Sequence, residues 1–237
     1  MFFIKLADIN IGISCKYQSL KRFCADYITD CKEADLTVSV TDADILKEKI
    51  NADGAYSDSY LASICVYRAI CKALPRFGAF MLHSAVVKLD GAAYAFSAPS
   101  GTGKSTHADL WIKHFGDRAS ILNGDKPILR FKGENLFVYG SPWCGKEGQN
   151  KNDSAPLDAI CFIERGNVNS IKRIDPGSAI AHIFPQILLP ESESSANLIF
   201  SILDKTLTTV PCFKLSCNIS DEAVTVAYNG MKKTNYL

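Results

Sequence analysis

The sequence has little that would direct the protein to nucleic acid or to a membrane. Its 26 Lys and Arg residues nearly balance its 25 Asp and Glu residues, and no basic block stands out, so its charge supports neither partner. The longest apolar stretch, 60–74, contains Arg68 and Lys72 and is too short to span a bilayer. The N-terminus lacks the long apolar core and the small-residue cleavage site of a signal peptide. We therefore expect a cytoplasmic protein without a nucleic-acid or membrane partner.

The nine cysteines contain no Cys-x-x-C pair, a spacing typical of redox and zinc motifs. Cys65 and Cys71 share a predicted helix, but six residues apart they point to different faces. Disulfides and a metal site are the alternatives to reduced, buried thiols, and the apolar setting of most cysteines favours the thiols. Cys144 is the exception, because it lies in a glycine-rich loop.

A phosphate-binding motif is the most informative feature that is present. Residues 98–105 read Ala-Pro-Ser-Gly-Thr-Gly-Lys-Ser and match the P-loop pattern G-x-x-x-x-G-K-[ST], with alanine at the first glycine position. The glycines would let backbone N–H groups point at phosphate oxygens, Lys104 would reach the β- and γ-phosphates, and Ser105 would bind Mg²⁺. We assign phosphate contacts to Ser100, Gly101, Thr102, Gly103, Lys104, Ser105 and Thr106. The alternative is a glycine-rich turn that binds nothing.

The order of the predicted elements indicates an α/β protein with a mixed sheet. Two short strands around Asp90-Gly91 lead into the motif, a helix over 106–115 follows it, and one strand is predicted over 80–87. Further strands are predicted within 2–13 and at 36–40, 119–125, 157–164, 170–174 and 210–215, with a hairpin over 127–139 and a long loop over 140–153. Further helices are predicted at 20–28, 42–50 capped by Thr41, 58–74 ended by Pro75, 179–189 kinked by Pro185, 195–208 and 221–231. Strands and helices do not alternate strictly, which argues against a simple doubly wound sheet.

Two titratable residues flank the motif. A P-loop needs a second carboxylate for Mg²⁺, commonly at the end of a neighbouring strand, and Asp125 follows an apolar strand-like run. The alternative is an ordinary turn aspartate after an Asn-Gly pair. His83 lies in the strand before the motif, where it would contact the transferred phosphoryl group or a carboxylate, or would be a half-buried histidine with a satisfied hydrogen bond. His107 and His114 are expected on the surface of the helix that follows the motif.

The loop over 140–148 combines an aromatic residue, a cation and a carboxylate among glycines, namely Trp143, Lys146 and Glu147. This composition suits a lid that grips a substrate. The alternative is a solvated loop with Trp143 packed back onto the core.

The run from His83 to Asp125 resembles the catalytic domain of HPr kinase/phosphorylase, whose fold is related to that of phosphoenolpyruvate carboxykinase. In that family a strand histidine precedes a P-loop of the form S-G-x-G-K-S, and an Asp-Asp pair follows it. The chain is most similar to short HPr-kinase-like proteins often found near peptide-modification genes. The matching segments are 98–107, 110–111, 115–118, 123–127 and 140–145, with weaker similarity from Ser59 to the C-terminus.

The resemblance implies an α/β fold in which a mixed-sheet P-loop core of the HPr kinase and phosphoenolpyruvate carboxykinase type carries a small N-terminal α/β lobe. We expect the lobe over 1–55, which resembles the family little and can pack as part of one domain, and the catalytic domain over 56–237. Kinases of this type often assemble, so a homo-oligomer is among the expectations.

The resemblance also implies a kinase that uses ATP and Mg²⁺ and phosphorylates a serine-type hydroxyl on a peptide, a protein or a small molecule. Lys104, Asp125 and His83 would be catalytic. Mg²⁺ would be held by Ser105 and Asp125. The acceptor would be bound with the help of Trp143, Lys146 and Glu147.

Two departures from the family narrow this expectation. Gly124 stands where the family has the first aspartate of its pair, which divides magnesium binding from general-base work. Loss of this base need not abolish transfer, because a loose transition state depends mainly on positioning and charge neutralisation, and His83, Asp125 or Glu147 could also accept the proton. The chain also has no counterpart of the Gly-Ile-Ile segment of the bifunctional enzyme, so we do not expect its phosphorylase reaction or recognition of HPr. The short relatives, some of which phosphorylate peptides, are the better guide.

Two other functions remain open from the sequence. Gly124 in place of the family aspartate motivates a non-catalytic, nucleotide-binding regulatory protein. A carboxykinase-like enzyme that acts on a small carboxylic acid is the third reading, and it would require a further Mn²⁺ site.

Overall fold

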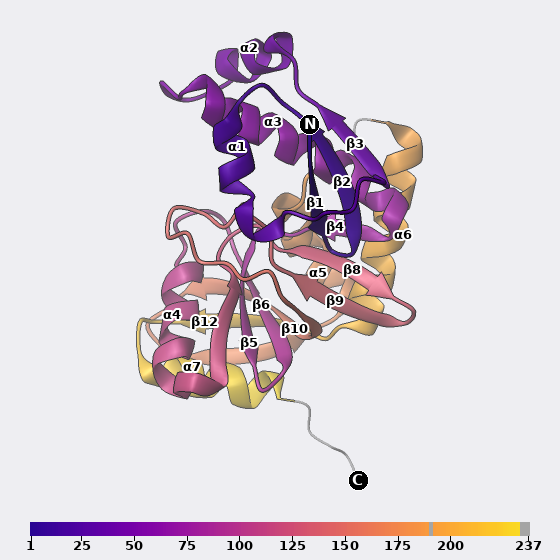
Figure 1. The fold of residues 1–237 in the computed structure, drawn as a ribbon. Coiled ribbons are helices and arrows are strands. Elements are labelled where there is room, and N and C mark those ends of the chain that lie inside the picture. Colours follow the sequence, from indigo (N-terminus) through magenta and orange to yellow (C-terminus); the bar gives the residue numbers. More distant parts are fainter. Residues whose placement is uncertain (190–191, 233–237) are drawn as a thin grey trace.

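The structure, a computed structural model, describes residues 1–189 and 192–232, so the last residues of the predicted domain 56–237 lie outside the described part. The chain begins with a three-stranded sheet in the order β1-β2-β3, which lies with its helices at the top of Figure 1. Strands β1 and β2 are antiparallel, and β2 and β3 are parallel. The elements of this part are β1 (Phe2–Leu6), β2 (Ile9–Ser14), α1 (Gln18–Phe23), η1 (Ala25–Tyr27), β3 (Leu36–Ser39), α2 (Asp42–Ile50), α3 (Asp58–Ala73) and the 3₁₀ turn η2 (Leu74–Phe77).

The rest of the described chain forms a nine-stranded mixed sheet that branches at β10. The first path runs β4-β8-β9-β10-β6-β5-β7, and β12 pairs with both β10 and β11. Its elements are β4 (Ala79–Met81), β5 (Ser84–Leu89), β6 (Ala92–Ser97), α4 (Lys104–Phe115), η3 (Gly116–Arg118), β7 (Ala119–Asn123), β8 (Ile128–Lys132), β9 (Asn135–Tyr139), β10 (Ser154–Arg165), β11 (Ser170–Ile174), α5 (Pro176–Ile183), η4 (Phe184–Gln186), α6 (Glu193–Thr209), β12 (Cys212–Cys217) and α7 (Asp221–Met231). Strand β10 is parallel to β6 and β12 and antiparallel to β9. The predicted mixed α/β architecture is confirmed.

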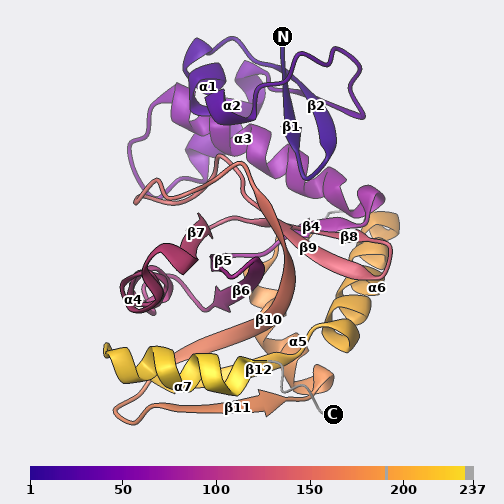
Figure 2. The ribbon, with the colours of Figure 1, turned by 60° about the horizontal axis from the view of Figure 1, so that its bottom comes forward.

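Helices cover both faces of the branched sheet. Apolar side chains of α4 and α7 pack on one face, together with Phe96 and Leu215. Side chains of α5 and α6 pack on the other face, together with Ala95 and Ile160. Neighbouring residues of β6 thus pack into hydrophobic cores on opposite faces of the sheet, because side chains alternate between the two faces along a strand. Figure 2 shows α4 and α6 on opposite sides of β5, β6 and β10.

The N-terminal sheet shares a hydrophobic core with the large sheet. Buried side chains of β1 and β2 belong to the same cluster as Ile128 and Trp143. Polar contacts cross the same boundary, because Tyr139 donates a hydrogen bond to Asp8 (2.8 Å) and Tyr27 donates one to Asn150 (2.8 Å). The predicted division of the chain at residue 55 stays a prediction.

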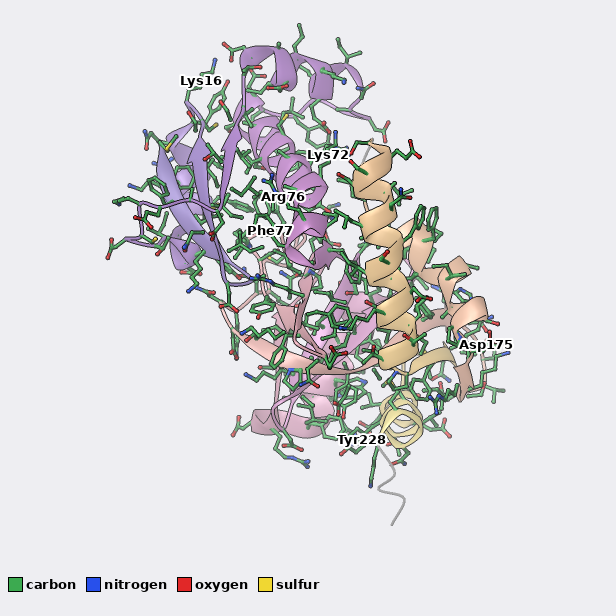
Figure 3. The ribbon with its side chains drawn as sticks, turned by 90° about the vertical axis from the view of Figure 1, so that its right-hand side faces the viewer. Lys16, Lys72, Arg76, Phe77, Asp175 and Tyr228 are labelled. Atoms are coloured by element: carbon green, nitrogen blue, oxygen red, sulfur yellow. The ribbon has the colours of Figure 1, made fainter. Side chains whose placement is uncertain are left out.

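Several local signals in the sequence act as predicted. Thr41 caps α2 in a reciprocal capping box, as predicted, and the structure adds Ser57 as the cap of α3. The β5–β6 hairpin turns at Asp90 (φ 49°) and Gly91 (φ 89°), as a two-residue Asp-Gly turn requires. Pro75 ends α3 in the turn η2, whose Arg76 and Phe77 are marked beside α6 in Figure 3. Within the described residues, no helix is both long enough and apolar enough to cross a membrane.

Two predictions are wrong. The strand predicted over 80–87 is broken into β4 and β5, because the backbone N–H of His83 bonds to the carbonyl of Gln186 (2.8 Å) and not to a neighbouring strand. His107 is not on the surface of α4. It is buried against the sheet, and its Nε2 accepts a hydrogen bond from the Trp111 indole (3.0 Å). His114 is exposed as predicted.

Candidate functional site

The glycine-rich loop connects the end of β6 to the start of α4. Gly101 (φ 78°) and Gly103 (φ 123°) hold backbone conformations that residues with a Cβ atom rarely adopt. These two glycines therefore let the loop turn back over the N-terminus of α4. The motif predicted from residues 98–105 lies in the strand–loop–helix setting that a phosphate-binding loop requires.

The N-terminus of α4 differs from those of the other long helices in the described chain. Side-chain oxygens cap α2, α3, α5, α6 and α7, whereas the N-cap of α4 is Gly103, which offers no side chain. The first backbone N–H groups of a helix have no partner within it, and the helix dipole places partial positive charge there. The end of α4 at the loop is therefore suited to an anion.

Lys104 is folded back over the loop. Its side chain is 7% exposed, and its ammonium group donates hydrogen bonds to the carbonyls of Ala98 (2.9 Å) and Pro99 (3.4 Å). Burial lowers the pKa of Lys104. The negative charge of Asp125 acts to raise this pKa, and the positive charge of Lys126 acts to lower it further. Lys104 thus lies close enough to Asp125 for their charges to interact.

Arg165, at the end of β10, holds the loop from the other side. Its guanidinium donates hydrogen bonds to the carbonyls of Gly101 (2.5 Å) and Thr102 (3.2 Å). These bonds tie two carbonyl oxygens of the loop to a cation from β10. No local pattern in the sequence signals this contact, because Arg165 comes from a strand far along the chain.

Asp125 is bound by two side chains, one on each carboxylate oxygen. Nε2 of His83 lies 3.1 Å from Oδ1, and the ammonium group of Lys126 donates to Oδ2 at 2.7 Å. Burial alone would raise the pKa of Asp125, but the bonds and charges of His83 and Lys126 outweigh it and lower the pKa to about 2. The carboxylate is therefore ionised across the physiological pH range.

His83 is fixed at the break between β4 and β5. Its Nδ1 lies 2.8 Å from Oε1 of Gln186, and its carbonyl accepts a hydrogen bond from Ser97, the last residue of β6 (2.9 Å). The break in the predicted strand thus orients the imidazole toward Asp125. It also ties this histidine to the strand that enters the glycine-rich loop.

Asn123 joins the Asp125 turn to the long loop over 140–153. Its side chain is fully buried. Its Oδ1 accepts hydrogen bonds from the backbone N–H groups of Asp125 (2.9 Å) and Lys126 (2.7 Å), and its Nδ2 donates to the carbonyl of Ser141 (3.0 Å). One amide group therefore sets both the direction of the Asp125 turn and the position of the loop.

Glycines allow this loop to approach Asp125. A Cβ atom at position 124 would lie 3.0 Å from the carbonyl oxygen of Cys144, and one at position 145 would lie 3.2 Å from the Cβ atom of Asp125. Gly145 also has a positive φ of 82°. The family aspartate that Gly124 replaces would therefore press on the backbone of the loop.

The predicted acceptor residues of this loop divide between core and surface. Trp143 is 5% exposed and donates a hydrogen bond to the carbonyl of Ser63 in α3 (3.2 Å), while Lys146 and Glu147 are exposed. Trp143, Lys146 and Asp125 line one cavity of about 580 Å³, and Glu147 is not among the residues that line it. Trp143 thus packs on the core and also walls a cavity.

The cysteine thiols are free in the structure, and six of the nine are buried. Cys144, the exception expected from the sequence, is buried, and its sulfur accepts a hydrogen bond from Asn150 (3.2 Å). Burial raises its pKa, so the thiol is not activated as a nucleophile.

A second cavity of about 660 Å³ borders the glycine-rich loop, between α4 and the ends of β10 and β12. Thr102, Thr106, Arg165 and Asn218 are among its polar lining residues. The loop therefore lies beside this cavity, while Asp125 faces the cavity of Trp143. Ser100 is an exposed residue of the loop, and Ser105 is half-buried in the first turn of α4.

No family model matches the sequence, and no curated protein is similar to it. Among solved structures, the chain is similar to the HPr(Ser) kinase/phosphatase from Coxiella burnetii, with a TM-score of 0.37 and 9% sequence identity over 63% of this chain and 94% of that one. Similarity at this level carries no argument about function. The proposal below therefore rests on the geometry of the site and on the sequence motif.

Proposed function

We propose that the protein is an ATP- and Mg²⁺-dependent kinase with a P-loop core of the HPr kinase type, which transfers the γ-phosphate to a hydroxyl group. The observation that carries the proposal is the glycine-rich loop, with an uncapped helix N-terminus and a buried lysine, next to the Asp125–His83 pair. The loop N–H groups would hold the phosphates, and Lys104 would neutralise charge that develops on the β–γ bridge.

The nucleoside would extend into the cavity of about 660 Å³ beside the loop. Its size suits a small-molecule site. Its polar lining includes Thr106 and Asn218, which offer hydrogen-bond partners to a ribose or a base. In this placement the γ-phosphate would extend toward Lys104 and Asp125.

Ser105 and Asp125 would hold Mg²⁺ together with the phosphates. The donor set fits, because Mg²⁺ in phosphoryl-transfer sites is commonly held by one or two protein oxygens plus phosphate and water, and the lowered pKa of Asp125 keeps its carboxylate ionised. When bound, the metal would neutralise charge on the β- and γ-phosphates. Within the described residues, no group of three or more His, Cys, Asp or Glu side chains is arranged to hold a metal ion by itself.

Transfer would break the bond between the γ-phosphorus and the β–γ bridging oxygen and form a bond from phosphorus to the acceptor oxygen, with ADP as the leaving group and the hydroxyl proton passing to water. With a pKa of about 2, Asp125 is a weak base, so it would orient the acceptor hydroxyl more than deprotonate it. His83 would position Asp125 and face the incoming phosphoryl group. Phosphoryl transfer through a loose transition state depends mainly on such positioning and on charge neutralisation.

The proposal is tested with γ-labelled ATP and Mg²⁺. The purified protein is offered a cell extract that has been divided into protein, peptide and small-molecule fractions. We expect one fraction to become labelled by the wild-type protein and not by Lys104→Ala. The control variant Lys113→Ala should still label it, because Lys113 is an exposed lysine in the last turn of the same helix. Equal labelling by wild type and Lys104→Ala would contradict the proposal.

A non-catalytic nucleotide-binding protein is the second candidate. Two observations favour it: position 124 has no room for the family aspartate without displacing Cys144, and Lys126 already neutralises Asp125. This candidate predicts tight binding of ATP, no labelled fraction, and little change of ATP affinity in Asp125→Asn. If the protein is a kinase, as proposed, Asp125→Asn should abolish labelling.

A further inference from the structure

The cavity of about 580 Å³ beside Asp125 lies between the N-terminal helices and the long loop. Its apolar walls come from three separate segments: Leu20 and Phe23 of α1, Tyr60 and Ile64 of α3, and Pro142 and Trp143 of the loop. The family resemblance covers the loop residues 140–145 and, more weakly, the chain from Ser59 onward, so of the three walls the one from α1 lies outside it.

Aromatic side chains at the cavity are held open to solvent. Phe23 is 47% exposed and Tyr60 is 50% exposed. Phe23 meets the edge of Trp143 with ring centroids 5.9 Å apart, and Tyr56 stacks on Tyr60 at 5.1 Å. Exposed aromatic surface gathered around a concave site is typical of a site that binds an apolar group.

Asp125, Lys126 and Lys146 bring the charged groups of the cavity lining, and α1 and α3 add the hydroxyl groups of Ser19, Ser59 and Ser63. A molecule that places an apolar body against Phe23, Tyr60 and Trp143 can therefore present a hydroxyl group to Asp125. The volume lies in the range of small-molecule sites.

We propose that this cavity binds the phosphoacceptor as a small alcohol with an aromatic body, whose ring packs against Phe23, Tyr60 and Trp143 while its hydroxyl faces Asp125. The inference rests on the proposed function, since Asp125 meets the γ-phosphate only if ATP binds at the glycine-rich loop. Aromatic rings favour edge-to-face and offset contacts with one another. The three walls supply such contacts, so an aromatic alcohol is preferred over an aliphatic one of the same reactivity.

The test compares 2-phenylethanol with ethanol as acceptors at saturating Mg·ATP. We expect kcat/KM to be at least about ten-fold higher for 2-phenylethanol, and we expect Phe23→Ala and Tyr60→Ala each to lower it by about ten-fold. Both side chains are about half exposed, so neither change threatens the fold. Phe200→Ala is the matched control, because Phe200 is 46% exposed on α6 and does not line the cavity.

Binding is read without catalysis from the fluorescence of Trp143. The chain has two tryptophans, so Trp111→Phe leaves Trp143 as the single reporter. We expect 2-phenylethanol to change this emission in a saturable way, and Phe23→Ala to weaken the binding by about ten-fold.

The outcomes separate the two proposals. Equal kcat/KM for both alcohols, or equal effects of Phe23→Ala and Phe200→Ala, would refute the proposal that this cavity binds the acceptor. Lys104-dependent use of ATP would still support the proposed kinase activity. Saturable binding at Trp143 in a protein that does not bind Mg·ATP would overturn the kinase and, with it, the assignment of this ligand as a phosphoacceptor.

Discussion

The hydrogen-bond partners of Asp125, and not its burial, determine the charge state of its carboxylate. Burial acts to raise its pKa, and the bonds from His83 and Lys126 act to lower it. The same carboxylate faces the cavity that Trp143 and Lys146 line. Under the proposed function, this ionised group would lie where an acceptor and a phosphate meet, and it would orient them although it is a poor base.

Asp125→Asn should change the pH dependence of stability. The pKa of Asp125 falls from 3.8 to about 2 on folding, which corresponds to about 2 kcal/mol of stability. Because the folded pKa is the lower one, this stability is present above the unfolded value and is lost as the pH falls toward the folded value. In urea unfolding, the advantage of wild type over Asp125→Asn should shrink by about 2 kcal/mol between pH 5 and pH 2. Asp117→Asn, at an exposed aspartate, should show no such change, and a pH-independent advantage would count against the Asp125 ion pairs.

His107 is a second residue whose environment sets its protonation. Burial lowers its pKa from 6.5 to about 4, so folding favours the neutral ring that accepts the Trp111 hydrogen bond. The unfolded chain takes up a proton first as the pH falls, so stability of about 3 kcal/mol is present above pH 6.5 and is lost toward pH 4. His107→Gln should remove this part of the acid sensitivity in unfolding experiments. His114→Gln, an exposed histidine of the same helix, should keep it, and equal acid sensitivity of wild type and His107→Gln would refute the assignment.

At the scale of elements, the long loop and the Asp125 turn form one unit. Asn123 bonds to both, and Gly124 and Gly145 allow the two backbones to approach closely. The loop is therefore a wall of the site with a defined position, fixed further by the indole of Trp143 on α3.

Two glycines of the loop offer a matched pair of substitutions. Gly145 (φ 82°) and Gly148 (φ 67°) both hold positive φ values, so Gly145→Ala and Gly148→Ala should each lower the free energy of unfolding by about 1 kcal/mol. Only a Cβ atom at position 145 meets Asp125, at 3.2 Å, while one at position 148 has open space. Gly145→Ala should therefore also lower the rate of phosphoryl transfer by about ten-fold, and Gly148→Ala should not. Equal rates in the two variants would show that the loop does not position Asp125.

Local signals explain which elements could be predicted from the sequence. Capping residues, the Asp-Gly turn and Pro75 act over a few residues, so the bounds that the sequence predicts for the helices and hairpins lie close to the observed ones. The break at His83 depends on Gln186, which lies far away in the sequence, and apolar composition alone could not reveal it. The burial of His107 is not predictable from its position in the sequence, because it depends on how α4 packs against Phe96, whose ring centroid lies 4.7 Å from that of the imidazole.

The same distinction between local signals and distant contacts applies to the candidate site. The motif predicted the loop, Lys104 and Ser105, and the positions of Asp125 after one strand and of His83 before the motif pointed to these two residues, as did the resemblance. Lys126, Asn123 and Arg165 were missed as functional residues, because their roles depend on contacts made by folding. Lys126 and Asn123 do lie in the Asn-Gly-Asp-Lys-Pro segment that the resemblance covers, which is the signal that could have found them.

At the scale of the whole molecule, the N-terminal sheet and the large sheet depend on each other. Residues of β1 and β2 share a core with Ile128 and Trp143, and α1 and α3 supply walls of the Asp125 cavity. The N-terminal part thus contributes to stability and to the site at once. Cytoplasmic location and assembly into a homo-oligomer stay predictions.

Deleting residues 1–55 should leave a chain that does not fold, because it exposes the core side chains of α3 and β8 that β1 and β2 cover. Circular dichroism should show no cooperative thermal transition for the fragment. Tyr139→Phe is the milder companion, since it removes one hydroxyl group, which bonds to Asp8 and also interacts with Lys132, and it should cost about 1 kcal/mol. A folded fragment that binds ATP would show that the large sheet is an independent domain.

The central claim is that residues 98–105 bind the phosphates of a nucleotide. Isothermal titration calorimetry of Mg·ATP with wild type, Lys104→Ala and Lys113→Ala tests it most directly. Wild type and Lys113→Ala should bind with the same affinity, and Lys104→Ala should bind at least about ten-fold more weakly, because a charged hydrogen bond to phosphate contributes about 1.5–3 kcal/mol. No binding by wild type, or the same affinity in Lys104→Ala as in wild type, would contradict the claim.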